Sequence, residues 1–500
     1  MSEGIATLRN AVRPEVVAKH LGQLGLVIAG LTLAPAVAGL IANEIDIALR
    51  FVTVAALLAL LCVPMARLRI QGQIQANEVA RLRIQGQIQA NEVLTVSALV
   101  YLLAALAGTW PMLGLDLPFA DAFFETVSGV TTTGLSTLAS VESLPRSILF
   151  ARAWNQWYGG LGIAVLAVAM LTSYDLSTQR LMEKPPADEH LLTTTLGHAR
   201  RVTRVYLALT LLGIVGLLMT GLSTCEAVLH VLSAVSTGGF GTHDGNLAGL
   251  PSRSAQILIN LLALLCAVSL PIYALLFRGQ WRRALGDIEL KALLVAGGTI
   301  VALLLGIAWL TPSESPQPAA IDLALLGISA QTTSGFSTID PRGLDALSKG
   351  LLIAAMSVGG SIGSTAGGIK LLRLIMVMRL LQLLLRRVAM PAHAVIDLTV
   401  GGRKVPDGEA LRTLMLVLLF PLTAFLSWLP FLAWGYPPLE SLFEVVSALG
   451  TVGLSCGITG PALPDALKAV LCADMLLGRL EFIAVLILIM PATWIGRRTS

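Results

Sequence analysis

This sequence has little charge and few aromatic residues. Only 13% of its 500 residues are Asp, Glu, Lys or Arg and 5% are aromatic, whereas 55% are hydrophobic. Its mean hydropathy is +0.79. A soluble domain of this length needs far more surface charge than that. The composition therefore predicts a helical protein that crosses a membrane many times.

Several functional motifs are also absent. The five cysteines and six histidines are dispersed, without the spacing of a zinc or redox site. No GxGxxG motif follows a strand, and Ile369 stands where a P-loop requires lysine. Serine and threonine are plentiful, but no deep His–Asp or Lys partner is apparent to activate them. We therefore expect no enzymatic activity, no cofactor in this chain and no nucleic-acid partner.

The apolar runs suffice for ten spanning helices, because about 20 helical residues cross a bilayer. They lie near 22–42, 46–64, 94–112, 147–172, 202–222, 254–277, 289–310, 346–386, 409–434 and 466–495. At 1.5 Å per residue, the run 346–386 would measure roughly 60 Å. We expect this run to tilt, break or leave the membrane.

The basic residues gather in alternate connecting segments. Segments 1–20, 66–93, 173–204, 278–291, 370–412 and 497–498 hold 26 of the 34 Lys and Arg. Segments 111–146, 223–253, 311–345 and 435–468 hold four, against 13 acidic residues. Because Lys and Arg favour cytoplasmic loops, we predict that both termini are cytoplasmic. The acidic segments then face outward, where they raise the local cation concentration.

One exact repeat lies in a predicted cytoplasmic segment. ARLRIQGQIQANEV occurs at 66–79 and again at 80–93. Fourteen residues is close to four helical turns, so the copy would lengthen a helix with little change of face. We interpret it as a tolerated tandem duplication.

A second repeat has fewer identical residues, but it occurs four times with the same spacing. Its four copies read SGVTTTGLST from Ser128, SAVSTGGFGT from Ser233, SAQTTSGFST from Ser329 and SALGTVGLSC from Ser447. In each copy the serine is followed by Thr at +4 and Gly at +6. Seven residues before each serine stands an acid: Asp121, Glu226, Asp322 and Glu440. Four phased copies between spanning helices indicate one shared structure.

The pattern predicts a half-helix followed by a returning strand. The acid favours the start of a short helix, and about ten residues reach only about half-way through a bilayer. Non-helical backbone is allowed there only if it is buried or lines a watery path. Glycine at +6 permits left-handed backbone that aims carbonyls inward, as in a K⁺ filter. The candidate ion-binding residues are Thr131, Thr132, Thr133, Gly134, Ser236, Thr237, Gly238, Gly239, Thr332, Thr333, Ser334, Gly335, Gly450, Thr451, Val452 and Gly453.

Two further features lie deep in apolar runs. The stretch SVGGSIGSTAGGIK holds five glycines between 359 and 368, enough to break a helix; close packing of helices through small residues is the alternative. Arg479 lies within MLLGRLEFIAVLILIM. A charge at such depth is a functional-site hypothesis, with a structural ion pair as the alternative.

The four units, with TTTG, STGG, TTSG and GTVG, resemble the Trk/Ktr/HKT superfamily of cation transporters. Within that superfamily, they most resemble the membrane subunits of bacterial TrkH-type potassium uptake systems. The stretches QWYGGLGI, GSTAGGIK (363–370) and GRLE (478–481) carry the same resemblance. The resemblance covers about 94–495, and 22–64 matches the extra N-terminal helix pair of that branch. It implies K⁺ as the bound ion, and the four filter glycines favour K⁺ over Na⁺.

The same resemblance implies a gate and partners. An intramembrane gate would comprise Gly359, Gly360, Gly363, Ser364, Thr365, Gly367, Gly368 and Lys370, with Arg479 as an electrostatic barrier below the filter. The chain would sit in the bacterial inner membrane among lipids as a homodimer. A separate cytosolic NAD- or ATP-binding regulatory subunit would dock on its basic inner face.

The predicted fold is an all-α polytopic membrane protein with four pseudo-repeated helix–pore-loop–helix units around a central pore, plus an N-terminal helix pair. The expected divisions are 1–93, 94–188 (unit one), 189–284 (unit two), 285–400 (unit three, with the glycine-rich loop) and 401–500 (unit four). Two other functions stay open. One is a Na⁺-permeable pore, and the other is an ion-coupled secondary transporter of a small solute, whose repeats usually come in two.

Overall fold

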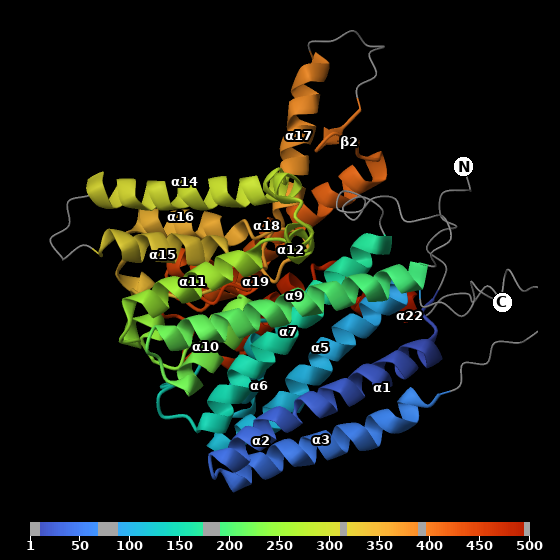
Figure 1. The fold of residues 1–500 in the computed structure, drawn as a ribbon, viewed down its shortest axis with the longest axis vertical. Coiled ribbons are helices and arrows are strands. Elements are labelled where there is room, and N and C mark those ends of the chain that lie inside the picture. Colours follow the sequence, from blue (N-terminus) through green and yellow to red (C-terminus); the bar gives the residue numbers. More distant parts are fainter. Residues whose placement is uncertain (1–10, 69–88, 174–190, 311–317, 389–396, 495–500) are drawn as a thin grey trace, which may run out of the picture. The chain divides into compact units, whose positions relative to one another are not determined.

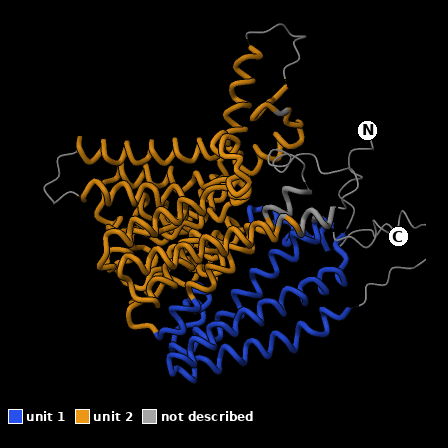
Figure 2. Tube along the Cα trace, viewed as in Figure 1, with its two compact units in different colours: residues 1–126, 145–151, 480–500 blue, residues 127–144, 152–479 orange. Residues whose placement is uncertain are grey.

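The computed structural model describes residues 11–68, 89–173, 191–310, 318–388 and 397–494, and these are almost all helical. Figure 1 labels the helices along the chain. The chain divides into two compact units, coloured separately in Figure 2. Unit 1 comprises 1–126, 145–151 and 480–500, and unit 2 comprises 127–144 and 152–479. The all-α fold is confirmed; the five divisions expected from the sequence stay a prediction.

Unit 1 holds the N-terminal helices and two short helices near the C-terminus. They are α1 (Pro14–Leu31), α2 (Leu33–Ile41), α3 (Ile45–Ala66), α5 (Ala90–Met112), the 3₁₀ turn η2 (Leu113–Leu115), α21 (Ile483–Ile489) and α22 (Pro491–Trp494). α1 and α2 form one apolar stretch of 28 residues and pack along α3, while α21 packs against α5. The predicted helix pair is therefore present and begins eight residues earlier than expected, at Pro14.

A buried ion pair joins the starts of α1 and α5. Arg13 Nε lies 2.7 Å from Glu92 Oε1, and the Glu92 side chain is fully buried. Glu92 also accepts from the Gln89 backbone N–H at 2.8 Å. Glu92 belongs to the second copy of the 14-residue repeat, so that copy supplies a structural contact. Residues 69–88, which hold most of the duplication, lie outside the described residues.

Unit 2 carries the larger helical body. Its helices are α9 (Leu191–Met219), α10 (Thr224–Val235), α11 (Arg253–Ala267), α12 (Leu270–Phe277), α13 (Trp281–Leu285), α14 (Ile288–Leu310), α15 (Ala320–Gln331), α16 (Ala346–Ser357), α17 (Leu371–Val388), α18 (Asp407–Ala433), α19 (Pro438–Leu449) and α20 (Asp465–Arg479). Two helices straddle the unit boundary: α6 (Phe119–Val130) and α7 (Arg146–Ser173). The 3₁₀ turns η3 (Asn246–Gly249) and η4 (Pro341–Gly343) lie in loops. A two-stranded antiparallel hairpin, β1 (Thr399–Val400) with β2 (Arg403–Lys404), precedes α18.

Four helices of unequal sequence have the same length. α6, α10, α15 and α19 each contain 12 residues and carry the predicted acid in their first turn. Twelve residues rise about 18 Å, roughly half of a bilayer core. These are the four half-helices that the repeat predicts.

Some of the long apolar runs form one continuous helix, whereas others break into two. Among the described residues, six helices are long and apolar enough to span a membrane, or seven if one bent pair is counted as a span. That pair, α11 and α12, bends by 91°, so the run expected at 254–277 is not one continuous helix but a broken span or a re-entrant loop. The run 346–386 breaks into α16 and α17, as its length required. The run 466–495 breaks after α20, where Glu481 and Phe482 have positive φ.

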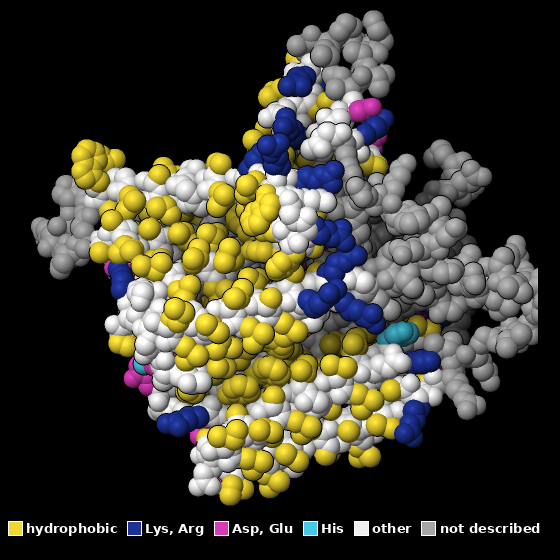
Figure 3. All heavy atoms as spheres, viewed as in Figure 1, with side chains coloured by type: hydrophobic (Ala, Val, Ile, Leu, Met, Phe, Trp, Pro, Cys, Tyr) yellow, Lys and Arg dark blue, Asp and Glu magenta, His cyan; other side chains and the backbone are white. Residues whose placement is uncertain are grey.

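The surface of unit 2 suits a lipid environment. Large apolar side chains on α9 and α14 are exposed, such as Leu212 (69%) and Val295 (69%), and hydrophobic side chains cover much of the visible length of these helices in Figure 3. Lys and Arg side chains gather near α17 in the same view. Inside, Tyr206, Leu217 and Phe336 belong to a fully buried cluster. Apolar residues therefore lie on both the inside and the outside, as in a multi-pass membrane protein.

Candidate functional site

Each half-helix ends in the same hydrogen-bonded turn. In the first copy, Thr133 N–H donates to Ser128 O at 2.9 Å and Thr132 N–H donates to Gly129 O at 3.0 Å. Both bonds recur at the equivalent positions of the other three copies, at 2.8–3.3 Å. This is a Schellman motif, which ends a helix with one left-handed residue. The repeat thus specifies where each half-helix stops.

The left-handed residue in all four turns is a threonine. Thr132, Thr237, Thr333 and Thr451 have φ of 55°, 53°, 54° and 50°. Left-handed backbone is a rare state for a β-branched residue, and such outliers cluster at functional sites because the surroundings must hold them. Two residues later the predicted glycines also have positive φ, from 68° at Gly335 to 95° at Gly134.

The four filter segments, 131–134, 236–239, 332–335 and 450–453, close into a ring. A Cβ placed on the glycine at +6 of one copy would overlap the +5 carbonyl of the next. The pairs run Gly134 with Gly238 O, Gly239 with Ser334 O, Gly335 with Val452 O, and Gly453 with Thr133 O. The cycle returns to its start, so all sixteen predicted filter residues come together. Only glycine leaves room for these carbonyls.

Most filter hydroxyls are engaged within their own copy. Thr131 Oγ1 donates to Val127 O at 2.7 Å and shares a 2.8 Å bond with Thr133 Oγ1. The hydroxyls of Thr132 and Thr451 are buried and have no partner among the described residues. In the first and fourth copies, the first serine of the repeat holds the backbone of the filter glycine. Gly134 N–H donates to Ser128 Oγ at 3.0 Å, and Gly453 N–H donates to Ser447 Oγ at 3.1 Å.

The glycine-rich stretch forms a loop, 358–370, between α16 and α17. Its base is closed by Gly359 N–H donating to Ile369 O at 3.0 Å and Ile369 N–H donating to Ser357 O at 2.9 Å. Gly363 and Gly368 have φ of 76° and 63°. Gly359 lies so close to Gly367 O that no side chain fits. The glycines therefore serve a folded loop, and helix packing through small residues does not describe this segment.

This loop contacts the ends of three half-helices. Thr365 Oγ1 donates to Val235 O, the last residue of α10, at 3.1 Å. Gly367 N–H donates to Thr333 Oγ1 at 2.7 Å, and a side chain at Gly367 would overlap Gly450 O and Thr451 Oγ1. The loop is thus packed directly against the carboxyl-end side of the filter ring.

The break between α11 and α12 makes room for the same loop. Helix carbonyls of Cys266 and Ala267, freed by the break, accept from Thr365 N–H at 3.3 Å and Ser361 N–H at 3.0 Å. Leu270 N–H in turn donates to Gly363 O at 3.1 Å. Helix termini leave such groups unpaired, and the loop satisfies them. This explains why the predicted straight span is bent.

Arg479 ends α20 beside the loop and is buried, with 2% exposure. Its Nη1 donates to Thr365 O at 2.8 Å and its Nη2 donates to Gly159 O at 3.3 Å. Gly159 lies against Val130 O, the last carbonyl of α6. The guanidinium therefore lies near the end of the half-helix that the loop does not reach. Lys370 Nζ donates to Ala366 O within the loop.

Two buried polar residues contact a filter segment or the residues just after one, and neither was predicted as a site residue. Gln156 on α7 donates to Gly238 O. Glu444 on α19 accepts from Ser455 Oγ at 2.6 Å, just beyond the fourth filter segment. Gln156 opens the quoted stretch QWYGGLGI, but a single glutamine in a helix gives no periodic signal. Glu444 stands four residues after Glu440, and the first copy repeats this spacing with Glu125 four residues after Asp121, which was the available signal.

Three of the four predicted acids at the helix starts face basic side chains. Arg253 Nη1 lies 2.6 Å from Asp322 Oδ1, and Lys349 Nζ lies 3.0 Å from Glu440 Oε1. The Arg253 guanidinium lowers the pKa of the Asp322 carboxyl, and the Lys349 ammonium lowers the pKa of the Glu440 carboxyl. Glu226 instead faces His243 at 3.4 Å. Each pair ties the start of a half-helix to a neighbouring segment.

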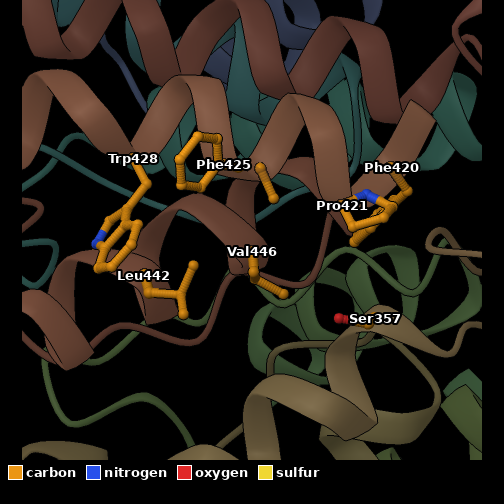
Figure 4. Close-up of a pocket in the computed structure, with 8 residues that line it drawn as sticks. Ser357, Phe420, Pro421, Phe425, Trp428, Leu442 and Val446 are labelled. Carbon is orange, nitrogen blue, oxygen red and sulfur yellow. The ribbon is translucent and has the colours of Figure 1, made fainter. Parts of the chain in front are cut away.

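A separate pocket of about 250 Å³ lies between α18, α19 and the end of α16 (Figure 4). Phe420, Phe425 and Trp428 point toward it, with Ser357 at its edge. Ser357 Oγ already donates to Ile353 O at 2.9 Å. An apolar lining offers no ligands to a dehydrated cation, so this pocket is not part of the candidate filter.

Four half-helices, a ring of backbone carbonyls and a loop beneath it define a class: multi-pass membrane transport proteins with a fourfold pore. Comparison with known proteins identifies the group within that class. Residues 88–493 match the TrkH family model, described as a cation transport protein. The chain therefore belongs to the TrkH family.

Individual relatives agree with this assignment. The chain is 30% identical over 397 residues to an uncharacterized cation transporter of Methanocaldococcus jannaschii, covering 79% of this chain and 81% of that protein. It is 29% identical over 392 residues to the Trk system potassium uptake protein TrkH of Escherichia coli K12, covering 76% and 80%. The crystal structure of the potassium transporter TrkH from Vibrio parahaemolyticus superposes with a TM-score of 0.83 at 25% identity, covering 96% and 99%.

Proposed function

We propose that this chain takes up K⁺ across the bacterial inner membrane through the ring of filter segments. The observation that carries the proposal is the closed cycle of glycines and carbonyls. Such carbonyls can replace the hydration shell of K⁺, and the carboxyl ends of four half-helices add negative potential that favours a cation. The potassium uptake relatives support the same ion.

Details of the filter support K⁺ rather than Na⁺ as the preferred ion. All four copies keep glycine at +6, and in the superfamily that the sequence resembles, serine at the first of these positions accompanies Na⁺ permeation. The free hydroxyls of Thr132 and Thr451 offer two further oxygen ligands at the inner end of the ring. The bound ion is the transported substrate.

We further propose that the loop 358–370 is the gate and that Arg479 is an electrostatic barrier. The loop's contacts with Val235, Thr333 and Gly450 support this role because the loop lies where ions would leave the filter. The guanidinium of Arg479 adds a positive charge at the same level, which opposes a cation. Opening would then require the loop to break its bonds to α10 and the third filter segment.

The remaining proposals concern the setting of the chain. We propose that both termini are cytoplasmic, as the distribution of Lys and Arg indicates. By resemblance to the family, the chain would act as a homodimer within membrane lipid. A separate cytosolic nucleotide-binding subunit would regulate it from the basic inner face.

Rb⁺ uptake by proteoliposomes tests the filter. Gly134→Asp should abolish uptake, because its side chain would overlap Gly238 O. The matched control is Gly221→Asp, which also changes a glycine with positive φ (88°) but has no neighbour within 4 Å of a new Cβ. Uptake that survives Gly134→Asp would refute the filter, whereas loss of uptake in both variants would indicate a general defect.

A further inference from the structure

We infer that Gln156 is a positioning residue of the filter, which fixes the carbonyl of Gly238 and thereby sets ion selectivity. The inference rests on the proposed function. Gln156 lies on α7 and is fully buried. Its carboxamide contacts residues before, within and after the second filter segment, and each contact is described below.

The carboxamide makes three hydrogen bonds to the second copy. Nε2 donates to Gly238 O. Oε1 accepts from Ser233 Oγ and from Phe240 N–H, the latter at 3.3 Å. The partners fix the orientation of the amide, because Phe240 N–H can only donate and Gly238 O can only accept. One side chain therefore ties the second filter segment to the helix beside it.

Gln156 also explains why the second copy reads STGG. The +5 position holds Thr133, Ser334 and Val452 in the other copies, but glycine here. A Cβ on Gly238 would lie 2.5 Å from Gln156 Oε1 and 2.8 Å from Nε2. The carboxamide occupies the space that a side chain fills in the other three copies. Gly238 and Gln156 therefore form a matched pair.

The hydrogen bond from Gln156 to Gly238 O makes one carbonyl of the ring different from the other three. Among the described residues, no donor is bonded to the equivalent carbonyl oxygens of Thr133, Ser334 or Val452. Of the four +5 carbonyl oxygens, Gly238 O alone accepts a hydrogen bond from a side-chain amide in the described part of the chain. This bond fixes the direction of the Gly238 carbonyl and reduces the negative potential that its oxygen presents to an ion. Selectivity between K⁺ and Na⁺ depends on the geometry and field strength of such carbonyls. A change at Gln156 should therefore alter the ratio of ions carried.

The test compares Rb⁺ and Na⁺ flux in proteoliposomes. Gln156→Met removes the amide at similar volume, and we expect the Rb⁺-to-Na⁺ flux ratio to fall about two- to tenfold, the factor for one net hydrogen bond. The control is Gln256→Met. Gln256 is also buried and donates Nε2 to a backbone carbonyl, Leu247 O at 2.8 Å, but outside the filter. Its ratio should match the wild type.

A second variant separates positioning from mere packing. Gln156→Glu keeps the size and the acceptor for Ser233 and Phe240, but an ionised carboxylate has no donor for Gly238 O. We expect a lowered flux ratio at about pH 8 that recovers toward about pH 6, where a protonated carboxyl donates again. The wild-type ratio should stay constant over this range.

The outcomes are distinct. An unchanged ratio in folded Gln156→Met, or a pH-independent ratio in Gln156→Glu, overturns the inference while leaving the proposed function standing. Loss of folding in both Gln156 variants, with Gln256→Met intact, assigns Gln156 a structural role and also overturns it. A wild-type chain that carries Rb⁺ and Na⁺ equally overturns the proposed function together with the inference.

Discussion

Glu444 offers a sharp test of how the segment that follows the fourth filter copy is held. Its side chain is fully buried. Oε1 accepts from Ser455 Oγ at 2.6 Å, Cys456 N–H at 2.8 Å and Ile458 N–H at 3.3 Å, and Oε2 accepts from Thr459 Oγ1 at 2.6 Å. All four partners donate, which suits an acceptor-only carboxylate. One side chain thus holds the whole segment that leaves the fourth filter copy.

We predict that Glu444→Leu opens this segment. The two hydroxyls can turn to other acceptors and the half-buried Ile458 N–H can reach water, but the buried Cys456 N–H is left without a partner. Such a buried group costs about 1–3 kcal/mol. Leucine itself should fit, because Leu326 occupies the equivalent position of the third copy. The cost should therefore appear as local opening of 455–459 rather than global unfolding.

Cys456 reports this opening directly. Its side chain is buried in the intact protein, whereas Cys225 is exposed and is first replaced by serine. In Glu444→Leu, the rate at which a maleimide labels Cys456 should rise at least tenfold, the factor for about 1.4 kcal/mol. The control is Glu440→Gln, one helical turn earlier, where a partly exposed pair with Lys349 contributes at most about 1 kcal/mol. An unchanged labelling rate in Glu444→Leu would refute the reasoning.

Three further changes test other parts of the site. Arg479→Ala should raise Rb⁺ flux by removing a positive charge beside the proposed gate, the loop 358–370, and a variant that fails to fold would instead indicate a structural role. Gly335→Ala should abolish uptake because a new Cβ would overlap Val452 O, whereas Gly343→Ala, with no atom within 4 Å, should retain it. Asp322 has a lowered pKa in the folded protein, so its contribution is present above its ordinary pKa of about 3.9 and is lost as pH falls through the lower folded value. The difference in thermal midpoint between wild type and Asp322→Asn should therefore persist at pH 5 and shrink below about pH 3.9, and a constant difference would contradict this assignment.

The half-helices and their turns were predictable because four copies share them. Each copy repeats the acid, the serine, the threonine and the glycine, and each yields a helix of 12 residues with the same terminal bonds. The left-handed backbone at glycine follows from its missing side chain. The same geometry at Thr132 and its equivalents was not foreseen, because β-branched residues seldom adopt it, although the Schellman turn at the end of each half-helix requires it.

The breaks in the second helices were less visible in the sequence. Hydropathy averaged over 254–277 shows one span, yet the chain turns by 91° between α11 and α12. Pro271 marks the start of α12 and was the local signal, since proline suits the first turn of a helix and disfavours its interior. The direction of the bend depends on the loop 358–370, about 90 residues away in the sequence, whose N–H groups take up the freed carbonyls.

What a repeat cannot predict is the part of each copy that differs. The ring is the same backbone four times, but the second, third and fourth copies are held by different neighbours. Gln156 bonds to the second copy, the loop through Gly367 bonds to the third, and Glu444 holds the exit of the fourth. Gln156 and Gly367 lie outside the four copies, and Glu444, which lies inside the fourth, has an acidic counterpart only in the first, Glu125. Because the shared backbone supplies the carbonyls and the unshared neighbours orient them, substitutions in the signature should abolish transport, whereas substitutions in the neighbours should change which ion passes or when.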